Sequence, residues 1–274
     1  MIIKALVENT SDYEAFGCEH GLSLYIETSK HQLLFDSGAS ALFAENATKM
    51  QVDLSAVDLA VISHGHYDHG GGLKTFLAVN NHAKAYLQQK AFGKYYSRKP
   101  NGEKKYIGLD QALVANERLV FTEHQHIIDS ELELFSGVKA NRFVPTGNQD
   151  LLVKVNDTLK QDDFAHEQNL IIKEDGKTIL IAGCAHNGIV NILEHFYTER
   201  GSMPDFVIGG FHLYNRSADR SENPKTVKQI GEYFLTTKAK FYTCHCTGLK
   251  SYRFLKGIMN EKIDYLSTGN EIKI

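Results

Sequence analysis

The sequence predicts a mixed α/β (α+β) fold in which two β-sheets pack face to face with helices outside, a four-layer αββα sandwich. Short β-rich runs separated by turns fill the first third of the chain, and the last third alternates apolar runs with helical patterns. The chain has 274 residues, of which 42% are hydrophobic, so it can bury a large core. We expect one domain over residues 1–274.

The first third reads as the meander of an antiparallel sheet. Runs at residues 2–7, 22–27 and 32–35 are each bounded by Gly, Ser, Asp or Lys, as strands commonly are. A helix is expected over residues 39–50. The continuous apolar run at residues 59–62 is too short for a helix and predicts a buried strand.

The last third predicts strand–helix units, which require helices that cover the faces of a sheet. The expected pairs are a strand at 178–182 with a helix at 188–197, 205–208 with 225–235, and 240–243 with 249–258.

The pattern is weaker between residues 82 and 150, where we expect a lid or an insertion. The stretch 95–106 is rich in tyrosine and basic residues around Pro100 and Gly102. One interpretation is a solvated loop with tyrosines packed beneath it. The other is a lid over the active site, in which Arg98 and Lys99 bind substrate.

Composition excludes several classes of function. The net charge is −3 and basic residues are dispersed, so a nucleic acid is not an expected partner. No apolar run is long enough to span a bilayer, and the N-terminus lacks the features of a signal peptide. Four cysteines are too few for a disulfide scaffold, which favours a reducing cytoplasm. Whether the chain forms a homo-oligomer stays open.

Potential metal ligands are concentrated in the segment 63–72, SHGHYDHGGG. His64 and His66 are two apart, so in an extended segment they face one side and can hold one ion. Asp68 and His69 follow a turn and can face a second ion. Imidazole nitrogen and carboxylate oxygen suit zinc and related divalent metals.

This segment resembles the His-x-His-x-Asp-His signature of the metallo-β-lactamase superfamily. Upstream, the run FDSG ending at Gly38 is similar to the superfamily's strand-end aspartate. That likeness implies that Asp36 orients a ligand histidine from behind. The alternative for Asp36 is an Asx turn with Gly38.

More of the chain resembles one branch of the superfamily, the group similar to 7,8-dihydropterin-6-methyl-4-(β-D-ribofuranosyl)-aminobenzene-5′-phosphate synthase. The matching blocks are EHGLS at 19–23, GCAHNG at 183–188, GGFHL at 209–213 and HCTG at 245–248. The resemblance runs along the whole chain and is weakest at about residues 110–165.

The resemblance implies further metal ligands. Cys184 stands where most members have an aspartate that bridges two metals, and it is either a ligand or a buried structural cysteine. His186 shares a strand face with Cys184 and is preferred over His166 as the middle histidine ligand. His245 ends a strand, as the last ligand histidine of the superfamily does.

Other residues of these blocks have alternative roles. By strand alternation Cys244 and Cys246 should point away from the metals, and we interpret both as structural. His212 could hold a substrate oxygen or donate a proton, or be a supporting histidine. His20 could line the pocket or lie in a surface turn.

The resemblance implies a metal-dependent hydrolase or transferase with two divalent ions, expected to be zinc, with manganese or iron as alternatives. Such ions make hydroxide from water near neutral pH, and this hydroxide would attack a phosphoryl or carbonyl centre, with Asp68 and His212 as the expected catalytic residues. The implied substrate is small, phosphorylated and ring-bearing.

One rival is an iron-dependent redox enzyme on the same fold. Iron-binding members of the superfamily usually carry a carboxylate at the position that His66 occupies in this chain. The other rival is a non-enzymatic metal-binding sensor, against which the intact ligand set argues.

Overall fold

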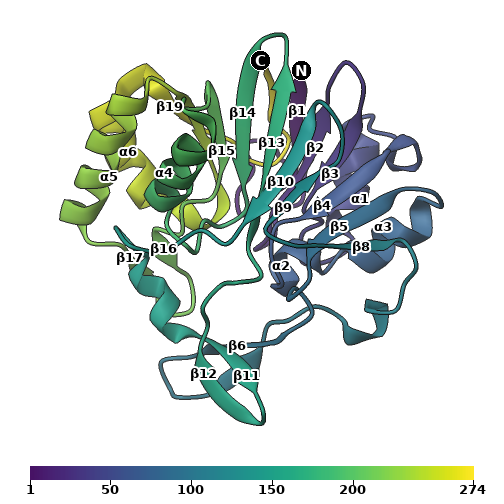
Figure 1. The fold of residues 1–274 in the computed structure, drawn as a ribbon, viewed down its shortest axis with the longest axis horizontal. Coiled ribbons are helices and arrows are strands. Elements are labelled where there is room, and N and C mark those ends of the chain that lie inside the picture. Colours follow the sequence, from purple (N-terminus) through teal and green to yellow (C-terminus); the bar gives the residue numbers. More distant parts are fainter.

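The computed structural model describes residues 1–274 and contains two seven-stranded sheets between layers of helices (Figure 1). The first sheet has the order β20-β1-β2-β3-β4-β5-β8. Its strands are β20 (Glu271–Lys273), β1 (Ile2–Val7), β2 (Ser23–Glu27), β3 (Gln32–Phe35), β4 (Leu59–Ile62), β5 (Lys84–Gln88) and β8 (Leu119–Thr122). Strands β1, β2 and β3 pair antiparallel, as the predicted meander requires, and β3, β4, β5 and β8 are parallel.

The second sheet has the order β19-β18-β15-β14-β13-β10-β9. Its strands are β19 (Ile263–Tyr265), β18 (Lys240–Thr243), β15 (Phe206–Gly209), β14 (Lys177–Ala182), β13 (Gln168–Glu174), β10 (Leu132–Ser136) and β9 (Gln125–Ile127). Strands β14, β15, β18 and β19 are parallel, so the residues that follow the first three emerge at one edge of the sheet.

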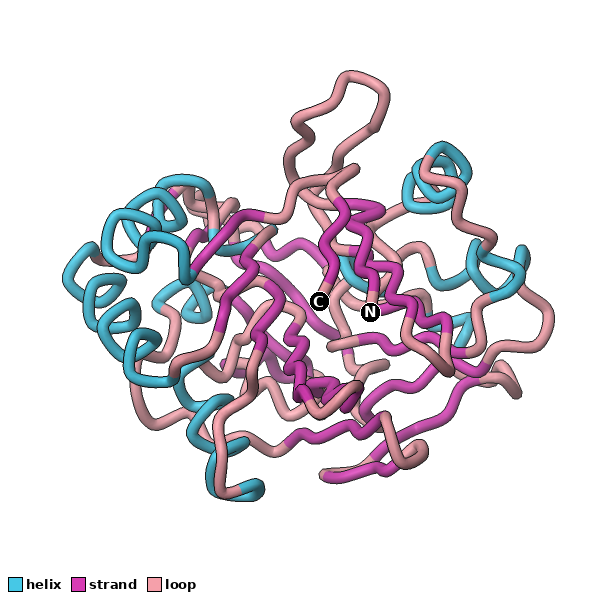
Figure 2. Tube along the Cα trace, turned by 90° about the horizontal axis from the view of Figure 1, so that it is seen from above, coloured by secondary structure: helices cyan, strands magenta, loops and turns pink.

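Helices form the two outer layers (Figure 2). Those beside the first sheet are α1 (Leu42–Lys49) and α3 (Leu73–Val79), and those beside the second are α4 (Ile189–Arg200), α5 (Pro224–Thr237) and α6 (Leu249–Met259). The short helices are α2 (Tyr67–Gly70), η1 (Leu54–Ala56), η2 (Gln111–Leu113), η3 (Thr146–Asp150), η4 (His245–Thr247) and η5 (Asn260–Lys262).

Three apolar cores hold the layers together. One lies between the sheets and includes Val61 and Ile181. The second packs the first sheet against α1 and α3, and the third packs the second sheet against α4, α5 and α6. Strand β4 shows the sequence basis, because Val61 faces the other sheet while Ala60 and Ile62 face helices. A strand covered on both faces is apolar throughout. The predicted αββα sandwich is confirmed.

The stretch 95–106 is not a loop, which corrects one of the two sequence interpretations. It contains β6 (Lys94–Arg98) and β7 (Lys104–Tyr106), which join β11 (Leu151–Val155) and β12 (Thr158–Gln161) in a sheet of order β12-β11-β6-β7. Gly102 has φ +84° in the hairpin turn, a conformation that glycine adopts readily. This small sheet projects below the two large ones in Figure 1. The remaining two strands, β16 (Tyr214–Asn215) and β17 (Arg220–Ser221), pair with each other. None of the helices is both long and apolar enough to cross a membrane.

Candidate metal centre

Side chains from both large sheets meet where their strands end. His64, His66, Asp68 and His69 follow β4, whereas Cys184 and His186 follow β14, and His212 and His245 follow β15 and β18. Four residues here have positive φ although they are not glycine: Asp36, Ala185, His212 and His245. Such backbone conformations are unfavourable and are concentrated at functional sites.

The first group of potential ligands is His64, His66 and His186. A ring nitrogen of each lies within 4.8 Å of the others. The Nε2 atoms of all three are buried and have no hydrogen-bond partner. Since buried polar atoms are almost always paired, three such nitrogens side by side fit a metal ion that supplies the missing partner.

The protonation state of this group also suits a metal. Burial, together with the other histidines, lowers the pKa of His64 and of His186 well below the usual value. Burial and the nearby His166 lower the pKa of His66 to about 3. The three rings are therefore neutral at pH 7 and offer lone pairs.

The second group is Asp68, His69 and His245. Nε2 of His69 lies 3.2 Å from Nε2 of His245, and Oδ2 of Asp68 lies 3.5 Å from the latter atom. Nε2 of His20 lies 3.2 Å from Oδ2 of Asp68, so His20 is in the pocket and not in a surface turn. Burial opposes the charged form of His69, but Asp36 and Asp68 outweigh it and raise its pKa to about 9.

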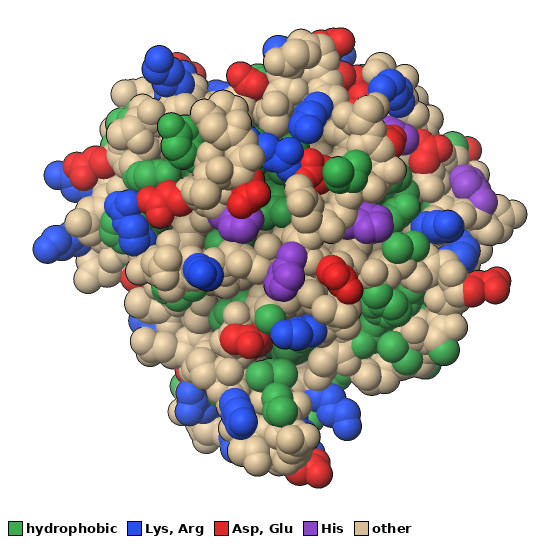
Figure 3. Space-filling view, in the orientation of Figure 1, with side chains coloured by type: hydrophobic (Ala, Val, Ile, Leu, Met, Phe, Trp, Pro, Cys, Tyr) green, Lys and Arg blue, Asp and Glu red, His purple; other side chains and the backbone are tan.

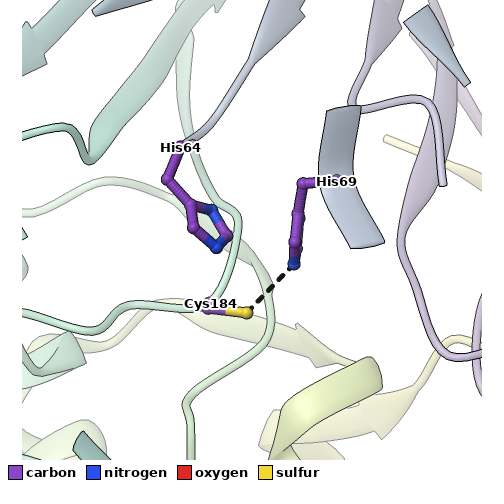
Figure 4. Close-up of side chains that lie close together, drawn as sticks. All are labelled: His64, His69 and Cys184. Carbon is purple, nitrogen blue, oxygen red and sulfur yellow. Dashed lines mark hydrogen bonds between the residues drawn. The ribbon is translucent and has the colours of Figure 1, made fainter. Parts of the chain in front are cut away.

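Cys184 lies between the two groups. Its Sγ atom is 3.1 Å from Nε2 of His69, and the side chains of His64, His69 and Cys184 converge (Figure 4). Cys184 also groups with His186 and His212. Imidazole, carboxylate and thiol groups from one set of strand ends can thus hold one or two divalent ions.

Supporting residues fix the ring orientations. Asp36 lies beside His69 and accepts hydrogen bonds from the backbone N–H and the hydroxyl of Ser63. Asn148 and Asn9 place an Oδ1 atom 3.1 Å and 2.8 Å from Nδ1 of His186 and of His245, respectively.

Sequence reasoning did not identify several of these supporting residues. Asn148 and Asn9 are distant in sequence from the histidines that they contact. Glu8 accepts the backbone N–H of His245, and Glu167 accepts those of His186 and Asn187. No local pattern signals these contacts.

His166 lies behind the cluster and not in either group of ligands described above. Its Nδ1 accepts a hydrogen bond from the backbone N–H of Gly65, and its Nε2 lies 3.1 Å from Oδ2 of Asp162. Both ring nitrogens are therefore occupied. The geometry favours His186 over His166 as the middle histidine.

The prediction for Cys246 is wrong, whereas Cys244 lies as expected in the core between the sheets. Cys246 lines the pocket and groups with Cys184 and His245. Strand alternation failed because β18 ends at Thr243 and the chain then turns through the single turn η4.

A pocket of about 280 Å³ opens over the cluster and is lined by His20, Asp68, Cys184, His186 and His212. Histidine side chains gather near the middle of this face, with basic side chains beside them (Figure 3). Nδ1 of His212 is buried without a partner, and the ring centre lies 4.2 Å from that of His186.

Basic residues form part of the pocket wall. Lys99, Lys105 and Arg216 line it. Arg98 does not, because its guanidinium donates to the Gln149 carbonyl at 2.7 Å. Of the two basic residues predicted to bind substrate, the structure brings Lys99 to the pocket and leaves Arg98 outside.

Comparisons with known proteins agree with this architecture. A model of the metallo-beta-lactamase superfamily matches residues 16–138. The chain is 29% identical over 264 residues to the uncharacterized protein MJ0448 of Methanocaldococcus jannaschii, a match that covers 94% of this chain and 95% of the relative.

A second relative from the same organism is 7,8-dihydropterin-6-methyl-4-(beta-D-ribofuranosyl)-aminobenzene-5′-phosphate synthase. It is 26% identical over 293 residues, which cover 99% of this chain and 96% of the synthase. Among solved structures, Tm1679, described as a metal-dependent hydrolase of the beta-lactamase superfamily, has 29% identity and a TM-score of 0.85. That match covers 100% of this chain and 99% of the other.

Proposed function

We propose that this chain is a member of the metallo-β-lactamase superfamily, whose model matches residues 16–138, and that it is an enzyme with two divalent metal ions that hydrolyses, or transfers a group from, a small phosphorylated molecule. The observation that carries the proposal is the convergence of three unpartnered, neutral imidazole nitrogens with a second group of donors a few ångströms away. A degraded site, as expected of a non-enzymatic module, would lack this set.

In this proposal His64, His66 and His186 hold one ion, and Asp68, His69 and His245 hold the other. The Cys184 thiol, which groups with His64 and His69 and also with His186 and His212, is proposed to contact one or both of these ions. Imidazole and thiolate donors favour zinc, with manganese or iron as alternatives. Bound divalent ions would polarise a substrate oxygen and lower the pKa of water to near neutrality.

Side chains around the cluster carry out proton transfer and bind the substrate. Asp68 accepts a proton or orients a nucleophile from its position beside His20 and His245. His212 has a free Nδ1 atom in the pocket wall, so it holds a substrate oxygen or gives a proton to a leaving group. Asp36 is a positioning residue, because it acts through His69.

Lys99, Lys105 and Arg216 supply positive charge to the substrate end of the pocket. Lysine attracts a phosphate as a point charge and arginine offers a planar fork of donors. The similarity to a synthase whose product name contains a ribofuranosyl phosphate supports a phosphorylated, ring-bearing substrate. We further propose that residues 1–274 are one domain in which β6, β7, β11 and β12 form an insertion beside the site. The four free thiols favour a reducing compartment such as the cytoplasm.

The test is a panel of phosphodiester, phosphomonoester and lactone substrates, assayed with metal-stripped protein and with protein reconstituted with zinc, manganese or iron. We expect turnover of at least one phosphorylated compound that depends on metal and is lost in His66→Ala. If the reconstituted, folded protein turns over no member of the panel, the proposed reaction class is wrong.

A further inference from the structure

Two thiols lie side by side in the wall of the pocket. Cys184 and Cys246 are 3% and 4% exposed, and both line the pocket. Their Sγ atoms and a ring nitrogen of His245 lie within 4.8 Å of one another. The Cys246 thiol also lies 3.6 Å from the Cys184 carbonyl oxygen, to which it donates. The two cysteines come from different strand ends, so the fold itself brings them together.

The backbone around Cys246 leaves room for its sulfur. A Cβ atom at Gly210 would lie 2.5 Å from Cys246 Sγ, so any larger residue at position 210 would displace the thiol. Cys246 Sγ accepts the backbone N–H of His212 at 3.3 Å. Cys244, by contrast, is fully buried between the sheets, and Cys18 is exposed on the surface.

We propose that Cys184 and Cys246 are a redox pair that a small peroxide oxidises to a reversible disulfide. One sulfur attacks the peroxide, an S–O bond forms as the O–O bond breaks, and the first water or alcohol leaves. The second sulfur attacks the resulting sulfenic acid, an S–S bond forms as the S–O bond breaks, and water leaves. Two thiols thus lose two electrons and one peroxide gains them. A dithiol reverses the step by exchange.

The disulfide would disconnect Cys184 from the metal cluster. Cys184 Sγ now lies 3.1 Å from Nε2 of His69, and an S–S bond of about 2.05 Å would tie this sulfur to Cys246 instead. A disulfide sulfur carries no thiolate to offer a metal. This consequence rests on the proposed function, whereas formation of the disulfide does not.

The experiment uses full-length protein with Cys18→Ser, which leaves three of the four thiols. After metal removal and treatment with hydrogen peroxide, trypsin should release the peptides 178–200 and 241–250 joined and lighter by two hydrogen atoms. Free thiols should fall from three to one, and dithiothreitol should restore them. Oxygen added to the separate peptides without any link would overturn the proposal.

Trypsin does not separate Cys244 from Cys246, so variants must identify the partner. Cys246→Ala should abolish the link and Cys244→Ala should retain it. Fragmentation of the linked peptide between the two cysteines gives the same assignment without any core substitution. A link through Cys244 would overturn the proposal.

Zinc provides the last comparison. In zinc-loaded protein the link should form about tenfold more slowly than in metal-free protein, because a metal-bound thiolate is shielded. Equal rates would overturn the coupling to the metal centre. If the link fails to form while zinc binds normally and the enzyme is active, the redox pair is wrong and the proposed function stands.

Discussion

Nδ1 of His69 lies 2.6 Å from Oδ2 of Asp36, and neither side chain is exposed to solvent. Because the same carboxylate accepts two hydrogen bonds from Ser63, it is fixed against the end of β4. The His69 ring is thereby held with its Nε2 atom toward His245 and Cys184. Orientation of a ligand histidine by a carboxylate also raises its basicity toward a metal.

Replacement of this carboxylate should weaken metal binding without loss of the fold. For Asp36→Asn we expect the dissociation constant of the more weakly bound zinc ion to rise about 10- to 100-fold. Competition with a chromogenic chelator measures it. The control is Asp53→Asn, since Asp53 accepts only local hydrogen bonds from Ser55. Unchanged zinc affinity in Asp36→Asn would mean that the contact is only structural.

His66→Ala should remove most of the bound metal and the activity while leaving the fold largely intact. The reason is that Nε2 of His66 makes no hydrogen bond within the protein, and the three apolar cores lie elsewhere. Metal content and circular dichroism on one sample provide the measurement, with the exposed His82→Ala as control. Full metal occupancy in the folded variant would refute the role assigned to His66.

Lys105 and Arg216 should bind the anionic end of the substrate. Replacing both with Ser should raise KM for a phosphorylated substrate about tenfold, equivalent to roughly 1.4 kcal/mol, and change kcat little. Lys104→Ser is the matched control, because Lys104 is exposed on the same strand and does not line the pocket. The same rise in KM for a neutral substrate would indicate that charge is not what the pocket recognises.

The metal-free protein should lose stability in acid. The folded-state pKa values of His64, His66 and His186 are lowered, so below the unfolded value of about 6.5 only the unfolded state binds these protons. The free energy of unfolding should therefore fall by roughly 1.4 kcal/mol per histidine for each pH unit below about 6.5.

His69 acts in the opposite pH range. Its pKa is raised to about 9, so its contribution to stability is complete below pH 6.5 and is lost as the pH rises through about 9. Urea unfolding of chelator-treated protein at pH 5.5, 6.5 and 9 tests both statements. His66→Gln should show a shallower decline in acid, and equal stability at all three values would contradict the assignment of neutral rings.

The four layers could be predicted because strands that are buried on both faces consist of apolar residues. The residues of β4 are all apolar, since one face meets the other sheet and the other meets helices. The small sheet was not recognised, because β6 and β7 carry several lysines and tyrosines and have no apolar alternation. The turn residues between them were the available signal.

Long-range contacts explain why parts of the site could not be predicted from the sequence. The motif around His64 is local and predicted a cluster. The choice between His186 and His166 depends on Gly65 and Asp162, which occupy both nitrogens of His166. The position of Cys246 depends on where β18 ends, and alternation carries no information beyond that residue.

We propose that this chain holds two divalent ions between the ends of its two sheets. The most direct test is the number of metal ions per chain, measured by mass spectrometry on protein purified without added metal. We expect two per chain, and substantially less than one in His66→Ala prepared in parallel. Two results would contradict this proposal. One is a trace metal content in the unmodified protein that does not rise when zinc is added, and the other is an equal metal content in both proteins.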